Sequence, residues 1–145
     1  MVPGLIVSVC ALLVATGLGI AWKQRNGRIT QVRGQGEVAT VPDAVPLTQA
    51  DIGAALGSRA TLVQFSSAFC APCRATRQVL TDVAGLVEGV SHVEIDAESR
   101  LDLVRRLDVR RTPTTIVLGP DGQVTHRASG QPRKADVIAA LGAVL

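Results

Sequence analysis

Length, charge and composition already exclude several functions. The chain has 145 residues and a formal net charge of +3, from 15 Lys and Arg against 12 Asp and Glu. This slight basic excess gives no reason to expect nucleic-acid binding. Aromatic residues make up 2% of the chain and Tyr is absent, so base-stacking platforms and aromatic carbohydrate clefts have almost nothing to be built from. Apolar residues make up 47%, which predicts a folded core rather than a disordered chain.

The first segment, residues 2–22, carries no charged side chain and is followed at once by Lys23 and Arg25. About 20 apolar residues, at a rise of about 1.5 Å each, span a hydrocarbon core of roughly 30 Å. We therefore expect one transmembrane anchor over residues 2–22. The basic residues after it predict that the rest of the chain lies on the cytoplasmic side, and an outward-facing domain remains the alternative.

Residues 23–46 differ in composition from the segments on both sides. They have scattered charges, no sustained apolar period, and the turn-forming residues Gly27, Gly34, Gly36, Pro42 and Pro46. This composition is typical of a linker. We expect a juxtamembrane linker over residues 23–46, with a short strand over Glu37–Val41.

Residues 47–145 alternate between strand and helix patterns, as in a single α/β domain. The expected strands are Ala60–Ser66, Val90–Asp96, Thr114–Leu118 and Gln123–Arg127. The expected helices run from Thr48 to about Gly57, from Ala71 toward Glu88, after Ser99, and from Pro132 onward. The turn Gly119-Pro120-Asp121-Gly122 predicts a hairpin between the last two strands. This order predicts one sheet with both parallel and antiparallel pairs.

Cys70 and Cys73 form a Cys-x-x-Cys pair between the first of these strands and the long helix. The first N–H groups of a helix have no helical partner and the helix dipole favours an anion there, so a thiolate at Cys70 is favoured. Pro72 is tolerated, because the N–H that it lacks would have no helical partner. We expect Cys70 to attack a substrate disulfide and Cys73 to resolve the mixed disulfide.

The order of motifs in residues 47–145 resembles the thioredoxin family. A Thr-Pro pair opens a strand about 40 residues after the Cys-x-x-Cys pair, which is a far more specific signal than the cysteines alone. The matching segments are Val63-Gln64-Phe65, Cys70-Ala71-Pro72-Cys73, Val93-Glu94-Ile95-Asp96 and Asp108–Thr114, with Gly130 before the last helix. The resemblance implies a thioredoxin-like three-layer fold with a mixed sheet. It also implies a cis peptide bond at Pro113, beside the nucleophile, and main-chain hydrogen bonds from Thr112 to the substrate.

Four positions depart from the pattern of the family. Phe69 stands where the family has Trp, and Ala71 where it has Gly; Gln64 replaces a buried aspartate and His92 an accompanying lysine. An amide cannot take a proton, whereas an imidazole titrates near neutrality. We therefore consider His92, expected beside Gln64 on the next strand, as a proton acceptor for Cys73. The alternative is a partly exposed strand histidine without a catalytic role.

Arginines gather before the Thr-Pro pair. Arg105, Arg106, Arg110 and Arg111 approach Thr112-Pro113 in the sequence. A basic rim there would favour acidic partners and weaken with salt. The alternative is a solvated helix face balanced by nearby acids.

The resemblance implies a thiol–disulfide oxidoreductase that reduces protein disulfides and receives electrons from an upstream donor such as a thioredoxin reductase. We expect a membrane-tethered monomer without a cofactor or bound metal. An outward-facing domain would leave an oxidase, an isomerase or a cytochrome-maturation reductase open, because the sequence does not set the redox potential. Interpretations of another class are a non-catalytic adaptor and a metal-binding module. Zinc prefers four ligands, however, and the sequence has no second Cys pair.

Overall fold

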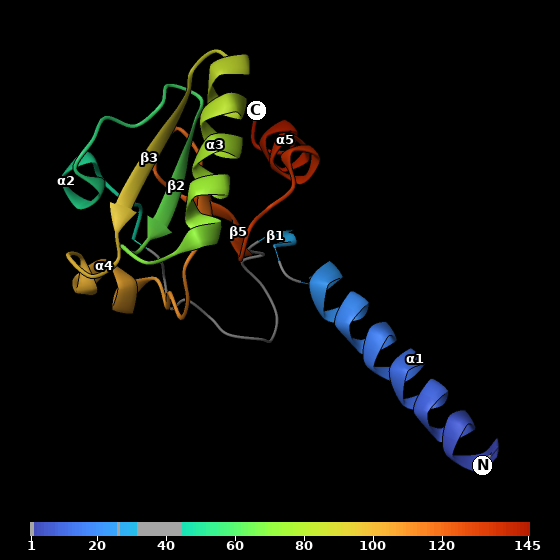
Figure 1. The fold of residues 1–145 in the computed structure, drawn as a ribbon. Helices are drawn as coiled ribbons and strands as arrows, with labels where there is room; N and C mark the ends of the chain where they lie inside the picture. The colour runs from blue at the N-terminus through green and yellow to red at the C-terminus, as the bar shows by residue number, and fades with distance from the viewer. Residues whose placement is uncertain (1, 26, 32–44) are drawn as a thin grey trace.

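A computed structural model describes residues 2–25, 27–31 and 45–145 (Figure 1). The helices are α1 (Val2–Arg25), α2 (Gln49–Ile52), α3 (Ala71–Leu86), α4 (Leu101–Arg106) and α5 (Lys134–Gly142). The strands are β1 (Ile29–Gln31), β2 (Ala60–Ser66), β3 (Val90–Asp96), β4 (Thr114–Leu118) and β5 (Val124–Ser129). The strand expected over Glu37–Val41 lies outside the described residues.

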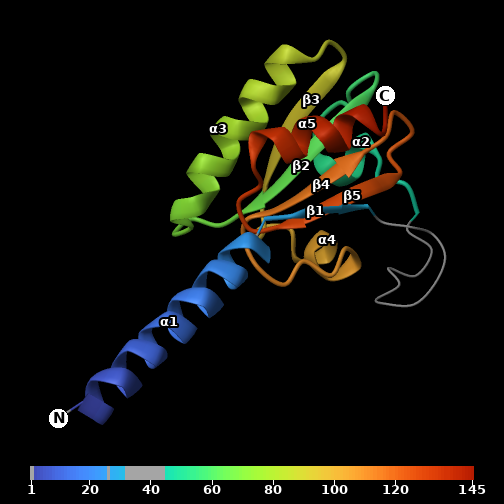
Figure 2. The ribbon, with the colours of Figure 1, turned by 90° about the vertical axis from the view of Figure 1, so that its right-hand side faces the viewer.

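The five strands form one mixed sheet in the order β1-β5-β4-β2-β3 (Figure 2). β2 and β3 are parallel, as a strand–helix–strand unit requires, and the other neighbouring pairs are antiparallel. The expected α/β fold with a mixed sheet is therefore confirmed.

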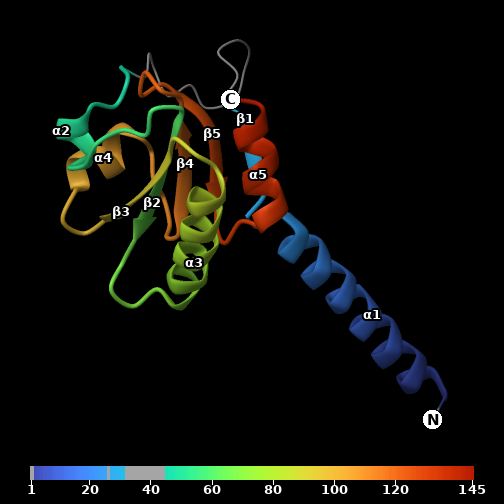
Figure 3. The same cartoon turned by 90° about the horizontal axis from the view of Figure 1, so that it is seen from above.

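Helices cover both faces of the sheet, so the domain has three layers (Figure 3). α2 and α4 lie on one face, over a core that includes Val63, Phe65 and Ile116. α3 and α5 lie on the other, over a core that includes Leu62 and Val117. Alternate residues of β2 feed the two cores, which explains why its apolar run is continuous rather than alternating.

Three helix boundaries differ from the sequence prediction: α5 begins at Lys134 rather than at Pro132, and the differences at α2 and α4 have a local cause. α2 ends at Ile52, because Gly53 adopts the left-handed conformation and stops the helix four residues before Gly57. α4 begins after Arg100, and the Ser99 hydroxyl donates instead to the carbonyl oxygen of Asp96. In both cases local turn chemistry, rather than the apolar period, sets the end of the helix.

The segment expected as a linker contains a strand. β1 pairs antiparallel with β5, with Ile29 opposite Ala128, and the Gly27 N–H donates to the Ser129 carbonyl oxygen at 2.9 Å. Residues 29–31 therefore extend the sheet at its β5 edge. A strand of three residues is too short to show a period in the sequence, which is why composition alone predicted a linker.

The transmembrane anchor expected over residues 2–22 is not supported. The segment forms helix α1, but among the helices of the described residues none is long and apolar enough to cross a membrane. This finding contradicts the predicted membrane location, and with it the side of the membrane inferred from charge.

Candidate active site

The chain passes from β2 into α3 through a short loop (Figure 1). Cys70 ends this loop, and Cys73 lies in the first turn of α3. Cys70 is the N-cap residue of α3, with an extended backbone, and its carbonyl oxygen accepts from the Cys73 N–H at 3.1 Å. Pro72 lies in the first turn, where no helical hydrogen bond is lost. One helical turn therefore carries both sulfur atoms, which form a disulfide with a Cα–Cα distance of 5.3 Å.

The two sulfur-bearing residues differ in exposure. Cys73 is 2% exposed and lies against the sheet, whereas Cys70 is half-buried at the rim of a hollow. Cys70 is therefore the more accessible of the two cysteines. Cys70 is also the N-cap residue of a 16-residue helix, and the dipole at the start of a helix favours a thiolate over a thiol.

The loop before β4 lies beside the loop after β2. β4 runs antiparallel to β2, with Thr114 opposite Phe65, so the residues beyond these two positions meet. The Ser67 and Thr112 hydroxyl oxygens are 3.0 Å apart, and the peptide bond between Thr112 and Pro113 is cis. The Pro113 carbonyl oxygen accepts from the Gly130 N–H at 2.8 Å, which ties this loop to the end of β5.

A hollow of about 670 Å³ surrounds the disulfide. Phe69, at its rim, is fully exposed. Across the hollow, Arg77 donates to both carboxylate oxygens of Glu94, at 2.6 and 2.8 Å. This hydrogen-bonded guanidinium lowers the pKa of Glu94, so the carboxylate stays ionised and paired at neutral pH.

Gln64 lies under the second cysteine. Its side chain is fully buried, and its Nε2 donates to the Cys73 carbonyl oxygen at 2.9 Å. Its Oε1 atom has no hydrogen-bond partner among the described residues. On the neighbouring strand β3, the residue opposite Gln64 is Glu94.

His92 does not lie beside Gln64, contrary to the expectation from sequence. The parallel register pairs His92 with Leu62, two residues before Gln64 on β2. The His92 Nδ1 atom lies 3.1 Å from the Thr81 hydroxyl, and Thr81 follows Cys73 by about two helical turns. Burial lowers the pKa of His92. The structure therefore places this imidazole along α3 and away from the disulfide.

The arginines expected to form a basic rim are largely engaged. Arg106 pairs with Asp51 at 2.8 Å, Arg110 with Asp108 at 3.0 Å, and Arg111 donates to the Ser129 carbonyl oxygen. Carboxylates therefore offset the charges of Arg106 and Arg110, whereas Arg111 is held by a neutral carbonyl oxygen. The structure thus favours the solvated, balanced face over a basic rim.

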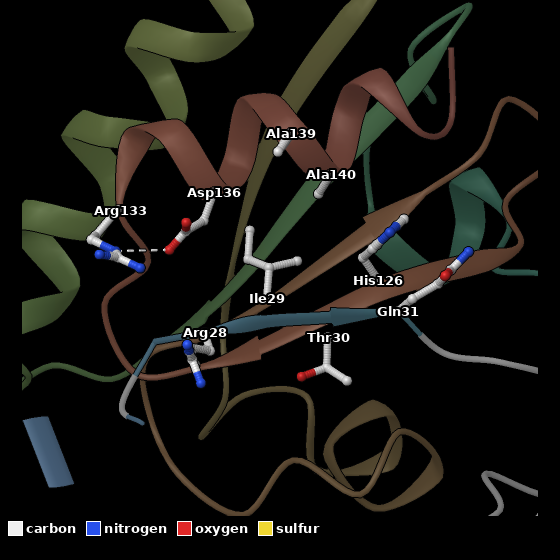
Figure 4. Close-up of a pocket in the computed structure, with 9 residues that line it drawn as sticks. All are labelled: Arg28, Ile29, Thr30, Gln31, His126, Arg133, Asp136, Ala139 and Ala140. Carbon is white, nitrogen blue, oxygen red and sulfur yellow. Dashed lines mark hydrogen bonds and ion pairs between the residues drawn. The ribbon is translucent and has the colours of Figure 1, made fainter. Parts of the chain in front are cut away.

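A second hollow lies between β1, β5 and α5 and holds no cysteine (Figure 4). Its charged groups include Arg133 and Asp136, which pair with each other at 3.0 Å, and burial lowers the pKa of His126. Within the described part of the chain, no three His, Cys, Asp or Glu side chains gather as a metal site. The redox pair is therefore the chemistry that the described residues offer, and the metal-binding interpretation gains no support.

Sequence comparison decides the family. Residues 44–143 match the profile of the Thioredoxin family. The chain belongs to the thioredoxin family. It is 30% identical to thioredoxin of Staphylococcus aureus over 92 residues, which cover 62% of this chain and 88% of that protein.

Solved thioredoxin structures agree with this assignment. Chloroplastic thioredoxin z shares 26% identity with a TM-score of 0.54, over 60% of this chain and 79% of that one. Mitochondrial thioredoxin 3 of Saccharomyces cerevisiae shares the fold, at 21% identity and a TM-score of 0.53, over 59% of this chain and 79% of that one. Members of the thioredoxin family are thiol–disulfide oxidoreductases acting on disulfide-containing substrates, and the Cys70–Cys73 pair fits such a redox-active site.

The structure adds residues to this thioredoxin site that the sequence did not single out. Ser67 contacts Thr112 across the two loops, and Arg77 holds Glu94 at the edge of the hollow. Neither residue stands in a recognisable motif. The contacts arise because antiparallel and parallel pairing bring distant segments together, so the sequence carried no local signal for them.

Proposed function

We propose that this chain reduces protein disulfides by dithiol–disulfide exchange, with Cys70 as the nucleophile and Cys73 as the resolving thiol. The observation that carries the proposal is the unequal exposure of the two residues. Cys70 is accessible at the start of α3, and Cys73 is buried one turn later within bonding distance of it. In this arrangement the Cys70 sulfur reacts with the substrate, and the Cys73 sulfur reacts in the second step.

The reaction has two balanced steps. The Cys70 thiolate attacks one sulfur of a substrate disulfide, forms a mixed disulfide, and releases the other substrate sulfur as a thiolate. Cys73 then attacks the Cys70 sulfur, and the second substrate thiolate leaves and takes up the proton that Cys73 gives up. The substrate disulfide becomes one thiol and one thiolate, which water can protonate, and Cys70 and Cys73 become the disulfide.

Docking of the substrate is proposed at Thr112 and Pro113. Thr112 contacts Ser67, which lines the hollow around the disulfide, and exposed Phe69 offers an apolar contact at the rim of that hollow. An extended substrate segment would pair with the backbone at Thr112 while its sulfur meets Cys70. An upstream dithiol donor would return the Cys70–Cys73 disulfide to the reduced state.

Turnover in an insulin-reduction assay tests this function. The reduced wild-type protein should accelerate the precipitation of insulin by dithiothreitol, and Cys70→Ser should abolish the acceleration. Cys10→Ser is the matched control, because Cys10 is a free cysteine on α1 and should leave the rate unchanged. An inert wild-type protein would favour the non-catalytic adaptor with a structural disulfide.

A further inference from the structure

The core under the disulfide ends in a buried polar cluster. Gln64, Thr76 and Thr115 are each fully buried. Each also has a side-chain oxygen without a hydrogen-bond partner among the described residues: Gln64 Oε1, Thr76 Oγ1 and Thr115 Oγ1. Buried polar atoms are normally paired, so three unpaired oxygens in one region call for a specific explanation.

Strand register places two of these residues on the same face of the sheet. Gln64 follows Leu62 by two positions on β2, and Thr115 precedes Val117 by two positions on β4. Leu62 and Val117 belong to the core under α3 and α5, and side chains two apart on a strand share a face. Gln64 and Thr115 are direct cross-strand partners, so their side chains are neighbours on that face.

Helical spacing brings the third residue to the same place. Thr76 precedes Leu80 of the same core by four positions and follows Cys73 by three, so the three side chains share one face of α3. The apolar layer therefore turns polar at the end that holds Cys73. There Gln64 has Thr115 as its neighbour on β4 and, on β3, Glu94, which is paired with Arg77.

The orientation of the Gln64 carboxamide is set by its contact. A backbone carbonyl oxygen only accepts, so the amide nitrogen of Gln64 faces the Cys73 carbonyl oxygen at 2.9 Å. The two polar atoms of a carboxamide share one carbon, so Oε1 lies in the same buried region as Nε2. Gln64 thus presents a fixed, unused acceptor to the surroundings of Cys73.

We propose that Gln64 is a positioning residue for the resolving cysteine and that its Oε1 accepts the S–H of Cys73 in the dithiol form. The disulfide gives Oε1 no such donor, because the Cys73 sulfur then carries no hydrogen. Reduction of the disulfide supplies this S–H donor. This inference rests on the proposed redox function of the Cys70–Cys73 pair. Gln64 is the residue whose hydrogen bonding would differ between the disulfide and the dithiol.

The Gln64 carboxamide accepts a hydrogen bond from the Cys73 S–H but does not remove its proton. In the resolving step the Cys73–Cys70 bond forms, the bond from Cys70 to the substrate breaks, and the proton of Cys73 passes to the departing substrate thiolate. Gln64 therefore favours the dithiol over the disulfide without acting as a base. Between pH 6 and 9 the exchange should titrate only with the reacting thiols, since Gln64, Thr76 and Thr115 carry no ionisable group. Glu94, the neighbour of Gln64 on β3, stays ionised over this range, because the hydrogen bond from Arg77 lowers its pKa.

Redox equilibrium with glutathione tests the proposal. Gln64→Met keeps the length of the side chain and removes both polar atoms. The contact of Nε2 with the Cys73 carbonyl is lost in both redox states, whereas the contact of Oε1 is lost only in the dithiol. The equilibrium should shift about fivefold toward the disulfide, the effect of one neutral hydrogen bond. Gln78→Met is the matched control, because Gln78 is exposed on α3, bonds Asp82, and should leave the equilibrium unchanged.

The outcomes separate this inference from the proposed function. An equilibrium unchanged by Gln64→Met, with both redox forms equally less stable in urea, would make Gln64 merely structural and overturn the inference. A wild-type pair that does not exchange with glutathione at all would overturn the proposed function first. Gln64→Glu adds a second readout: a buried carboxylate should give the exchange rate a new titration between pH 6 and 9.

A measurement on the native glutamine covers the case in which Gln64→Met does not fold. In protein carrying Cys70→Ala and Cys10→Ala, Cys73 is the remaining thiol, and its S–H stretching band can be read in the infrared spectrum. A hydrogen bond to Oε1 should move this band to lower frequency than that of an alkyl thiol in an apolar solvent. A band at the frequency of the free thiol would overturn the proposal.

Discussion

Cys70 and Cys73 share one helical turn but have different environments. Cys70 lies half-buried at the rim of a hollow, whereas Cys73 is 2% exposed and covers the amide of Gln64. The sequence determines that the two sulfurs are within reach of each other, because the spacing is local. Which sulfur meets the solvent depends on how α3 packs on the sheet.

His92 provides a test at this scale. Its imidazole contacts Thr81 rather than Cys73, so His92→Ala should leave single-turnover disulfide exchange unchanged from pH 6 to pH 9. The measurement is stopped-flow exchange with a disulfide peptide, with Cys70→Ser as the inactive reference. A loss of rate that appears only above or only below neutral pH would restore His92 as the proton acceptor for Cys73.

The short helix α2 is stabilised by contacts at its first turn. α2 spans only Gln49–Ile52, and a capping box closes its first turn: Asp51 accepts from the Thr48 N–H at 2.7 Å, and the Thr48 hydroxyl oxygen accepts from the Asp51 N–H. Arg106 of α4 adds an ion pair to the same carboxylate. These contacts lower the pKa of Asp51 to about 2, with the hydrogen bonds to Thr48 as the largest cause.

The pH dependence of this cap has a defined sign. Because the folded pKa of Asp51 lies below its unfolded value near 3.8, its contribution is present above pH 4 and is lost as the pH falls toward 2. Asp51→Asn should lower the free energy of unfolding at pH 7 by about 1 kcal/mol and flatten the loss of stability between pH 4 and pH 2. Urea titrations at several pH values check this.

A control separates the cap from net charge. Asp82→Asn removes a carboxylate from the exposed side of α3, away from any helix cap. It should leave both the stability at pH 7 and its acid dependence close to wild type. Equal effects of Asp51→Asn and Asp82→Asn would contradict the importance of the capping box.

Distant parts of the chain meet at a hairpin turn. Gly122, between β4 and β5, accepts at its carbonyl oxygen from the Leu47 N–H at 3.0 Å. Its φ is +80°, and a Cβ atom there would lie 2.1 Å from the Leu47 carbonyl oxygen. Leu47 is itself 1% exposed in the core, so this contact fixes the entry of the chain into the domain.

Replacement of this glycine should therefore destabilise the whole domain. Gly122→Ala combines left-handed strain with a backbone clash and should lower the free energy of unfolding by about 3 kcal/mol. Gly53→Ala is the matched control, with a φ of +72° but nothing within 4 Å of its Cβ position, and should cost about 1 kcal/mol. Similar losses in urea unfolding would show that the turn contact contributes little.

At the level of the whole molecule, the sequence by itself determined the long elements and the chemistry. The strands Ala60–Ser66 and Val90–Asp96 have the expected bounds, because continuous apolar runs mark buried strands. The Cys70–Cys73 pair could also be predicted from the sequence, because both cysteines lie within one helical turn. Only the tertiary structure decided that residues 29–31 extend the sheet and that Glu94, rather than His92, lies beside Gln64. Such neighbours are set by the register between strands, which depends on the packing of both sheet faces at once and leaves no mark in a local pattern.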